Sequence, residues 1–222
     1  MTAGQASAVG GTNGAIETLS TGHQVRLPLS THATMTFLCV DYDRIGHNSN
    51  ITQYNEFGVL IPAVHDDSRT LPYVSVLTRG VTGYIWHLPV TSEPAKALGV
   101  DIWGYQKEVA EITHDDDGST RHTSVHLDGQ HLIDVTVDRP PTVSQTDSGV
   151  SYTTKDGHVL REELELDGEI GVWPYSNSIS YTLGDHPRAE RLRDLDPSER
   201  ALLRFAADTE FGINEGEWVG SV

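Results

Sequence analysis

Short runs of hydrophobic residues alternate with turn-forming residues along most of the chain. From about residue 25 the strand-like runs include ATMTFLCVDY (33–42), EFGVLIPAV (56–64), LPYVSVLTRG (71–80) and TGYIWHLPV (82–90). Runs of this length, rich in β-branched and aromatic residues and bounded by polar clusters, are typical of β-strands. No βαβ alternation, glycine-rich phosphate loop or repeat of fixed period interrupts the pattern. The chain is therefore predicted to be mostly antiparallel sheet.

Asp-Gly pairs mark the expected turns in the second half of the chain. They occur in HDDDGS (114–119), LDGQ (127–130), KDGH (155–158) and LDGE (166–169). The pair favours the positive backbone angles of a two-residue hairpin turn. We therefore expect consecutive antiparallel hairpins, interrupted by one long loop at DRPPTVSQTDSG (138–149).

The first of three helix signals is TSEPAKALGV (91–100). Thr91 or Ser92 is the expected N-cap, because a side-chain oxygen before the first turn accepts a hydrogen bond from a free backbone N–H. Gly99 is the expected stop, because glycine commonly ends helices. The segment thus predicts one short helix.

The other two helix signals lie near the C-terminus. DPSERALLRFAADTEF (196–211) places Asp196 as an N-cap before Pro197 at the first helical position. HPRAERLRDL (186–195) is the third. The predicted fold class is therefore mostly antiparallel β (α+β), with two or three short helices.

The N-terminal residues 1–22 are small, polar and rich in glycine. They lack the basic and apolar regions of a secretion signal, so they are expected to form a flexible N-terminal arm. No linker divides the remainder, and residues 23–222 are predicted to form a single domain. Because the sequence has no apolar run of about 18 residues, we expect neither a membrane span nor a membrane partner, and a cytoplasmic location.

The composition narrows the range of partners. A formal net charge of −17 would repel the phosphates of a nucleic acid, so no nucleic-acid partner is expected. The acidity fits either solubility or a high-salt habitat. The single cysteine, Cys39, lies in an apolar run and is expected to be a buried thiol. His122, His126 and His131 share one predicted hairpin, which we interpret as a solvated face and not a metal site.

One of only three lysines, Lys107, lies within GVDIWGYQKEVAEI (99–112), a run rich in aromatic and aliphatic residues. Burial among such side chains disfavours the ammonium form and lowers the pKa of a lysine. A neutral amine can then form a Schiff base with a ketone. The alternative is a lysine whose stem lies on Trp103 or Tyr105 while its amine stays in water.

A second candidate is Glu56, in QYNEFGVLIPAVHDD (53–67). It lies between Tyr54 and an apolar strand. One interpretation is an edge carboxylate satisfied by a backbone or arginine partner. The other is a pocket carboxylate with a raised pKa that moves a proton.

Together these segments resemble the acetoacetate decarboxylase family. The likeness rests on YNEFGVLIPA (54–63), HLPVTSEPAKALGVDIWGYQKEVAEI (87–112) and YTLGDHPRAERLRDL (181–195). It implies that Lys107 is the Schiff-base lysine and that Glu56 is the pocket glutamate, which assists proton transfer and positions the substrate. It also implies a cone-like or barrel-like curled sheet, a homo-oligomer, and neither a metal nor an organic cofactor.

The sequence departs from the family pattern around the lysine. Gln106 stands where proline is usual, and Glu108 stands where the best-known members have a second lysine. A carboxylate beside Lys107 would raise the pKa of the amine unless Glu108 faces the other way, as neighbours on a strand do. The arginine that holds the substrate carboxylate has two candidates, Arg26 and the weaker Arg79.

The leading hypothesis is a lyase that decarboxylates a small β-keto acid through Lys107. Glu56, or a water that it orders, would protonate the enamine. The expected substrate-binding residues are Tyr54, Trp103, Tyr105, Gln106 and Arg26. The first alternative is an aldolase-dehydratase or cyclase that acts on a 2-keto acid such as pyruvate through the same lysine. The second is a barrel that binds small molecules without turnover, with Glu108 holding Lys107 as an ammonium ion.

Overall fold

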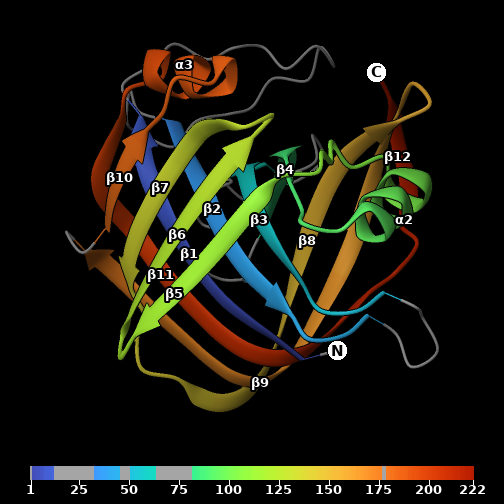
Figure 1. The fold of residues 1–222 in the computed structure, drawn as a ribbon. Coiled ribbons are helices and arrows are strands. Elements are labelled where there is room, and N and C mark those ends of the chain that lie inside the picture. Colours follow the sequence, from blue (N-terminus) through green and yellow to red (C-terminus); the bar gives the residue numbers. More distant parts are fainter. Residues whose placement is uncertain (1, 13–32, 46–50, 64–81, 177–178) are drawn as a thin grey trace.

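The structure is a computed structural model that describes residues 2–12, 33–45, 51–63, 82–176 and 179–222 (Figure 1). In this part of the chain two helices, α2 (Glu93–Trp103) and α3 (Pro187–Asp194), accompany twelve strands. The strands are β1 (Thr2–Thr12), β2 (Ala33–Tyr42), β3 (Tyr54–Ile61), β4 (Thr82–His87), β5 (Glu111–Asp117), β6 (Thr120–Leu127), β7 (Gln130–Asp138), β8 (Val143–Lys155), β9 (His158–Ser176), β10 (Ile179–Leu183), β11 (Pro197–Ile213) and β12 (Glu217–Ser221).

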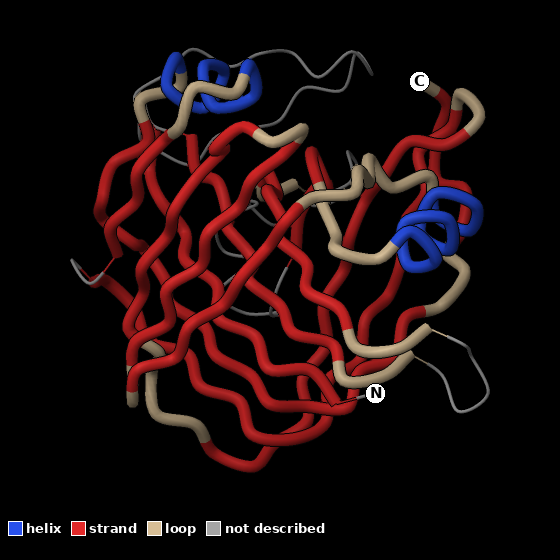
Figure 2. Tube along the Cα trace, in the orientation of Figure 1, coloured by secondary structure: helices blue, strands red, loops and turns tan. Residues whose placement is uncertain are grey.

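The strands form two sheets, one of them strongly curled (Figure 2). The larger sheet has eight strands in the order β11-β1-β2-β3-β4-β8-β9-β12, and β11 also pairs with β9. That additional pairing closes seven strands into a ring. The smaller sheet has the order β10-β7-β6-β5. Every described strand pairing is antiparallel except β4 with β8, so the predicted class, mostly antiparallel and barrel-like, is confirmed.

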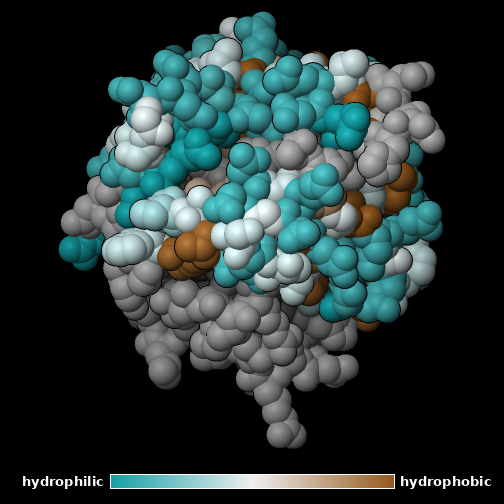
Figure 3. All heavy atoms as spheres, turned by 90° about the horizontal axis from the view of Figure 1, so that it is seen from below, coloured by the Kyte–Doolittle hydropathy of each residue, from teal (hydrophilic) through white to brown (hydrophobic). Residues whose placement is uncertain are grey.

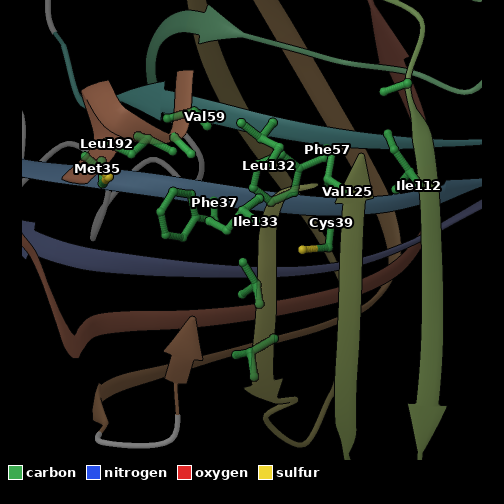
Figure 4. Close-up of a cluster of buried hydrophobic side chains, with 14 of the residues drawn as sticks. Met35, Phe37, Cys39, Phe57, Val59, Ile112, Val125, Leu132, Ile133 and Leu192 are labelled. Atoms are coloured by element: carbon green, nitrogen blue, oxygen red, sulfur yellow. The ribbon is translucent and has the colours of Figure 1, made fainter. Parts of the chain in front are cut away.

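Strands β2 and β3 have two buried faces, and these faces serve different purposes. Side chains alternate across a strand. Residues 35, 37 and 39 of β2 pack against the four-stranded sheet with Phe57 and Val59 of β3, as Figure 4 shows. On the other face, Leu38 and Val40 of β2 and Glu56 and Leu60 of β3 line a cavity inside the ring. The core between the sheets therefore fixes the register of the strands that line the ring. Cys39 belongs to this core as predicted, and burial raises the pKa of its thiol to about 11.

The Asp-Gly hairpins are confirmed at three of the four expected places. The turns at Asp128–Gly129 and Asp156–Gly157 have positive φ at both residues, as a two-residue hairpin of this kind requires, and Gly118 opens the turn between β5 and β6. The turn expected at 166–169 is wrong, because this segment lies inside the long strand β9. There Gly168 adopts φ 153 and lies so close to the Asp208 carbonyl oxygen that a Cβ would collide with it. Gly168 therefore allows the close approach of β11 to β9 and does not form a turn.

Helix α2 confirms the first helix signal but extends beyond its expected end. Ser92 is the N-cap, and its side chain accepts a hydrogen bond from the Ala95 N–H at 3.4 Å. The helix runs through Gly99, where a stop was predicted, and ends at Gly104 in the left-handed conformation with φ 69. Gly104 supplies the positive φ that a helix terminus needs.

The second helix signal is wrong, whereas the third is confirmed. Residues 197–213 form strand β11, which pairs with β1 on one edge and with β9 on the other. Burial of alternate side chains between two partner strands outweighs the local signal from Asp196 and Pro197, which a sequence window cannot anticipate. Helix α3 begins after His186, whose ring accepts a hydrogen bond from the Arg188 N–H at 3.2 Å.

The N-terminal segment also differs from its prediction. Residues 2–12 form β1, between β2 and β11, so the expectation of a flexible arm is wrong for them. Their small polar residues carry little local signal for a strand. Pairing with neighbours on both sides provides partners for the backbone, which only the assembled sheet supplies.

The described residues that are visible in Figure 3 are mainly hydrophilic, with small separate hydrophobic areas among them. Among the described residues, the most exposed large hydrophobic side chains are Val143, Trp218 and Trp173. Within the described ranges, neither helix has the length and apolar character needed to cross a membrane.

Candidate functional site

A cavity of about 130 Å³ lies inside the ring of strands, where α2 covers it. Its walls are largely aliphatic and aromatic. The lining includes Tyr42, Tyr54, Trp103 and Tyr105. The other apolar lining residues are Leu38, Val40, Ile45, Leu60, Ile85, Leu88, Ala95, Leu98, Leu164, Leu166, Phe211 and Ile213. Among the described lining residues, Lys107 is the only cation and Glu56 the only carboxylate.

Alternation along β3 directs two of the predicted residues into this cavity. Tyr54 and Glu56 lie two positions apart and face the inside of the ring, whereas Phe57 faces the core between the sheets. Glu56 is 5% exposed and Tyr54 is 4% exposed. The hydrophobic pattern of this strand therefore carries a carboxylate into an apolar interior.

Lys107 reaches the cavity from an irregular segment that follows α2. The segment runs beside residues 88–90, where the Gln106 carbonyl oxygen accepts a hydrogen bond from the Leu88 N–H and the Glu108 carbonyl oxygen accepts one from the Val90 N–H. These bonds fix the backbone on either side of the lysine. Its side chain enters the cavity and is only 6% exposed. The alternative of an amine in open water is not what the structure shows.

Gly99 makes room for the lysine stem. A Cβ on Gly99 would lie 2.6 Å from Lys107 Cε and 2.8 Å from its Cδ, closer than carbon atoms can approach. The glycine that sequence analysis interprets as a helix stop therefore lies within α2 because the lysine crosses the helix there. Glycine has a low helix propensity, but at this position it leaves the space that the Lys107 side chain occupies.

The Lys107 amine donates a hydrogen bond to Glu56 Oε2 at 2.7 Å, and both side chains are 6% exposed. Tyr42 donates a second, longer bond to Glu56 Oε1 at 3.3 Å. A buried charge without a partner is costly, so each member of the pair supports the presence of the other. Glu56 is thus placed to take a proton from the amine and to return it.

Aromatic rings frame this pair on two sides. The Tyr42 ring stacks on Tyr54 with centroids 4.6 Å apart, and Trp103 stacks on Tyr105 with centroids 5.4 Å apart. The Lys107 nitrogen lies 5.6 Å from the centre of the Tyr105 ring. Burial, and then the nearby Glu56 charge, raises the pKa of Tyr42 and of Tyr54 well above the usual value, so both phenols stay neutral.

The structure brings together Tyr54, Trp103 and Tyr105 with the two predicted catalytic residues, but not Gln106. Its side chain is exposed and is not among the cavity-lining residues, so its assignment as a substrate-binding residue is corrected. Neighbours in an extended segment point to opposite sides, and Lys107 takes the inner side. Arg26 and Arg79 lie outside the described residues.

Glu108 also points away from the amine, which corrects the hypothesis that it holds Lys107. Its Oε2 lies 2.8 Å from His87 Nε2 and accepts a hydrogen bond from Arg188 at 2.9 Å. Burial opposes the ionised form, but the bonds from Arg188 and His87 dominate and lower the pKa of the Glu108 carboxyl. This ion pair ties α3 to the segment that carries the lysine.

Sequence analysis did not identify a second carboxyl group beside the cavity. Glu162, on β9, is fully buried, and its cross-strand partner on β8 is Ser151, a cavity-lining residue. Ser151 Oγ lies 2.7 Å from Glu162 Oε2. Burial raises the pKa of Glu162 to about 7, against the lowering effect of hydrogen bonds from Ser151 and Thr153. In sequence, Glu162 is one of several glutamates in REELELDGE and carries no distinguishing signal.

Two of the hairpin histidines lie close together. The rings of His126 and His131 lie 5.2 Å apart, and His131 approaches Asp134 at 3.2 Å. In the part of the chain that the structure describes, no group of three or more histidine, cysteine, aspartate or glutamate side chains is arranged to hold a metal ion.

We predict that His87 makes the protein sensitive to acid. Its pKa is lowered to about 4, first by burial and then by the Arg188 charge, whereas an unfolded histidine titrates near ~6.5. Below pH ~6.5 the unfolded chain therefore binds more protons, and stability is lost as the pH falls towards 4. Between pH 7 and 4.5, His87→Gln should lose about 2 kcal/mol less unfolding free energy than the wild type in urea titrations.

A matched control for this prediction is His158→Gln, which removes an exposed histidine. It should follow the wild type across the same pH range. Equal acid losses in wild type and His87→Gln would contradict the prediction.

With the geometry established, comparisons with known proteins identify the family. A family model for acetoacetate decarboxylase matches residues 27–159, more than half of the chain. No curated protein matches the sequence. A solved structure from "Structural Studies of Acetoacetate Decarboxylase" is 15% identical with a TM-score of 0.55, and covers 97% of this chain and 88% of that one.

Two further solved structures share the fold at low identity. Acetoacetate decarboxylase from Legionella pneumophila is 11% identical with a TM-score of 0.59, and the match covers 100% of this chain and 88% of that one. The enduracididine biosynthesis enzyme MppR, complexed with the condensation product of pyruvate and imidazole 4-carboxaldehyde, is 9% identical with a TM-score of 0.60 and coverages of 99% and 90%. With the sequence match above, these findings show that the chain belongs to the acetoacetate decarboxylase family.

Proposed function

We propose that the protein is a Schiff-base lyase that decarboxylates a small β-keto acid through Lys107. One observation carries the proposal: the amine lies inside an apolar cavity, 2.7 Å from a buried carboxylate that can exchange a proton with it. Membership of a family that includes acetoacetate decarboxylase supports the same chemistry.

The reaction begins with a proton transfer within the buried pair. The Lys107 ammonium gives a proton to Glu56, and the neutral amine adds to the ketone carbon. Glu56 returns that proton to the departing hydroxyl, so water leaves and an iminium remains. The bond to the carboxylate then breaks, carbon dioxide leaves, and the electron pair enters the iminium to give an enamine. One proton adds to the enamine carbon, and hydrolysis releases the ketone and restores the ammonium.

The lining supports a substrate with an apolar acyl group. Tyr54, Trp103 and Tyr105 would contact that group together with the aliphatic wall. A cavity of about 130 Å³ approaches the ~150 Å³ that holds benzene in a protein interior, so it leaves room for a few methylene groups. Arg26 remains our candidate for the substrate carboxylate.

A second function deserves a direct test, because one relative with this fold carries a condensation product of pyruvate. An aldolase-dehydratase would use the same lysine and the same Glu56, but would form a carbon–carbon bond. The third possibility, binding without turnover, would keep Lys107 permanently as an ammonium ion paired with Glu56.

Borohydride trapping tests the nucleophile. After incubation with acetoacetate and reduction, mass spectrometry of peptides should find the adduct on Lys107, because only an amine that becomes neutral condenses with a ketone. Lys107→Met should abolish the adduct, whereas Lys96→Met, which alters a partly exposed lysine on α2 that pairs with Glu93, should retain it. Because Lys107→Met leaves Glu56 buried without its partner, a Lys107→Met/Glu56→Gln variant removes both charges as a second check. Absence of any adduct on Lys107 would refute the proposal.

A series of β-keto acids with longer alkyl groups tests the apolar acyl site. In the series from acetoacetate to 3-oxohexanoate, each added methylene enters the cavity and should raise kcat/KM about fourfold over the preceding substrate. Leu98→Phe, on the cavity wall, should remove this gain by filling the space. Val100→Phe alters a more exposed position of the same helix and should leave the gain intact. A flat series in the wild type would show that the wall does not contact the acyl group.

The reaction products distinguish decarboxylation from condensation. We expect acetoacetate to release carbon dioxide in the presence of the wild type and not of Lys107→Met. Pyruvate with an aldehyde should give no unsaturated keto acid. Formation of that acid, with acetoacetate left intact, would favour the aldolase-dehydratase. NMR of the reaction mixtures measures both outcomes.

A further inference from the structure

Decarboxylation consumes one proton per turnover, and the buried pair alone cannot supply it. In the proposed function, on which this inference rests, Glu56 gives up its proton when water leaves the carbinolamine. It is therefore a carboxylate when the enamine forms. Hydrolysis then returns a proton to Lys107 and not to Glu56. The proton that adds to the enamine carbon must come from another group that reaches the cavity.

Glu162 occupies a suitable place for that group. Its carboxyl lies directly behind Ser151, at 2.7 Å from the hydroxyl oxygen, and Ser151 lines the cavity. Ser151 is also hydrogen-bonded to Tyr105, whose ring lies beside the Lys107 amine. A single hydroxyl therefore connects Glu162 to the site where the enamine would form.

The hydrogen bonds around Glu162 are compatible with a proton on its carboxyl. The Thr153 hydroxyl oxygen lies 2.6 Å from the Trp103 carbonyl oxygen and 3.1 Å from Glu162 Oε1. A hydroxyl has one hydrogen, and a carbonyl oxygen cannot donate. If Thr153 donates to Trp103, the contact with Glu162 is a hydrogen bond only when Oε1 carries a proton and donates it to Thr153.

The charges around Glu162 agree with a neutral acid. Its neighbours on β8 are the hydroxyls of Ser151 and Thr153, and the neutral Tyr105 phenol is close enough to interact electrostatically with it. Among the described residues, no cation is hydrogen-bonded to the Glu162 carboxyl. Burial without a cation favours the protonated form and raises the pKa to about 7, where a group can both give and regain a proton at neutral pH.

We propose that Glu162 is the proton donor for the enamine and that it acts through the Ser151 hydroxyl. Rotation of the Glu162 carboxyl group first turns its protonated oxygen from Thr153 to Ser151, and Glu162 then passes the proton to Ser151 Oγ while the Ser151 hydroxyl proton moves to the enamine carbon. The carbon gains one C–H bond, the enamine becomes an iminium, and Glu162 becomes a carboxylate that accepts a hydrogen bond from Ser151. A proton from solvent restores the acid before the next turnover.

The exchange of acetone protons for deuterium isolates this step, because it forms and reprotonates the same enamine without any decarboxylation. In heavy water, with exchange followed by NMR, Glu162→Gln should slow exchange on the order of 10- to 100-fold. Ser151→Ala should slow it similarly. The matched control, Glu163→Gln, changes the exposed neighbour that pairs with Arg161, and should match the wild type. Borohydride trapping of acetone on Lys107 should be unchanged in all three variants.

The pH dependence separates a proton-transfer role from a purely structural one. In exchange, the Glu162 carboxylate must first remove a proton from the iminium. The ratio of wild-type to Glu162→Gln rates should therefore rise as the pH passes through about 7. A ratio near one at every pH, with normal trapping, would overturn this inference and leave the Schiff-base proposal standing. A wild type that traps acetone without exchanging it would also overturn it. Absence of trapping in the wild type would refute the proposed function itself.

Discussion

The burial of one amine beside one carboxylate constrains the rest of this structure. Lys107 and Glu56 are both almost completely removed from water, and neither charge could be buried alone without a large penalty. The pair therefore requires that β3 and the segment after α2 meet inside the ring. The space for that meeting comes from Gly99, whose missing side chain lets the lysine stem cross the helix. Chemistry and packing thus depend on the same contact.

The two faces of β2 and β3 explain how a cavity can persist within a stable fold. One face packs against the four-stranded sheet, with Phe37, Phe57 and Val59 almost fully buried (Figure 4). That contact supplies the hydrophobic stabilisation and holds the strands in register. The other face is then free to leave space around Lys107. The small sheet therefore acts as a support that keeps the cavity-lining face of the large sheet in place.

The antiparallel class and most hairpins could be predicted from the sequence because they depend on local patterns, whereas Lys107 and Glu56 were selected through the family resemblance. The Asp-Gly turns specify positive φ, and the alternation around Glu56 specifies an inward side chain. Sequence analysis failed where pairing between distant segments of the chain decides the structure. Residues 197–213 carry the start signal of a helix, but two partner strands make them β11. Gln106 and Lys107 are adjacent in sequence, and only the bonds of Gln106 and Glu108 to residues 88–90 determine which one enters the cavity.

Glu56 and Glu162 have opposite environments, which gives two chemically identical groups separate roles. Glu56 faces an amine, so its charge has a partner and it can take up the proton that the amine must lose. Glu162 faces the hydroxyls of Ser151 and Thr153, and its burial favours the protonated form. Environments that separate the proton affinities of two carboxyls are a general way of assigning acid and base. In the proposed reaction the assignment follows the order of the steps, because the amine must lose its proton before the enamine can gain one.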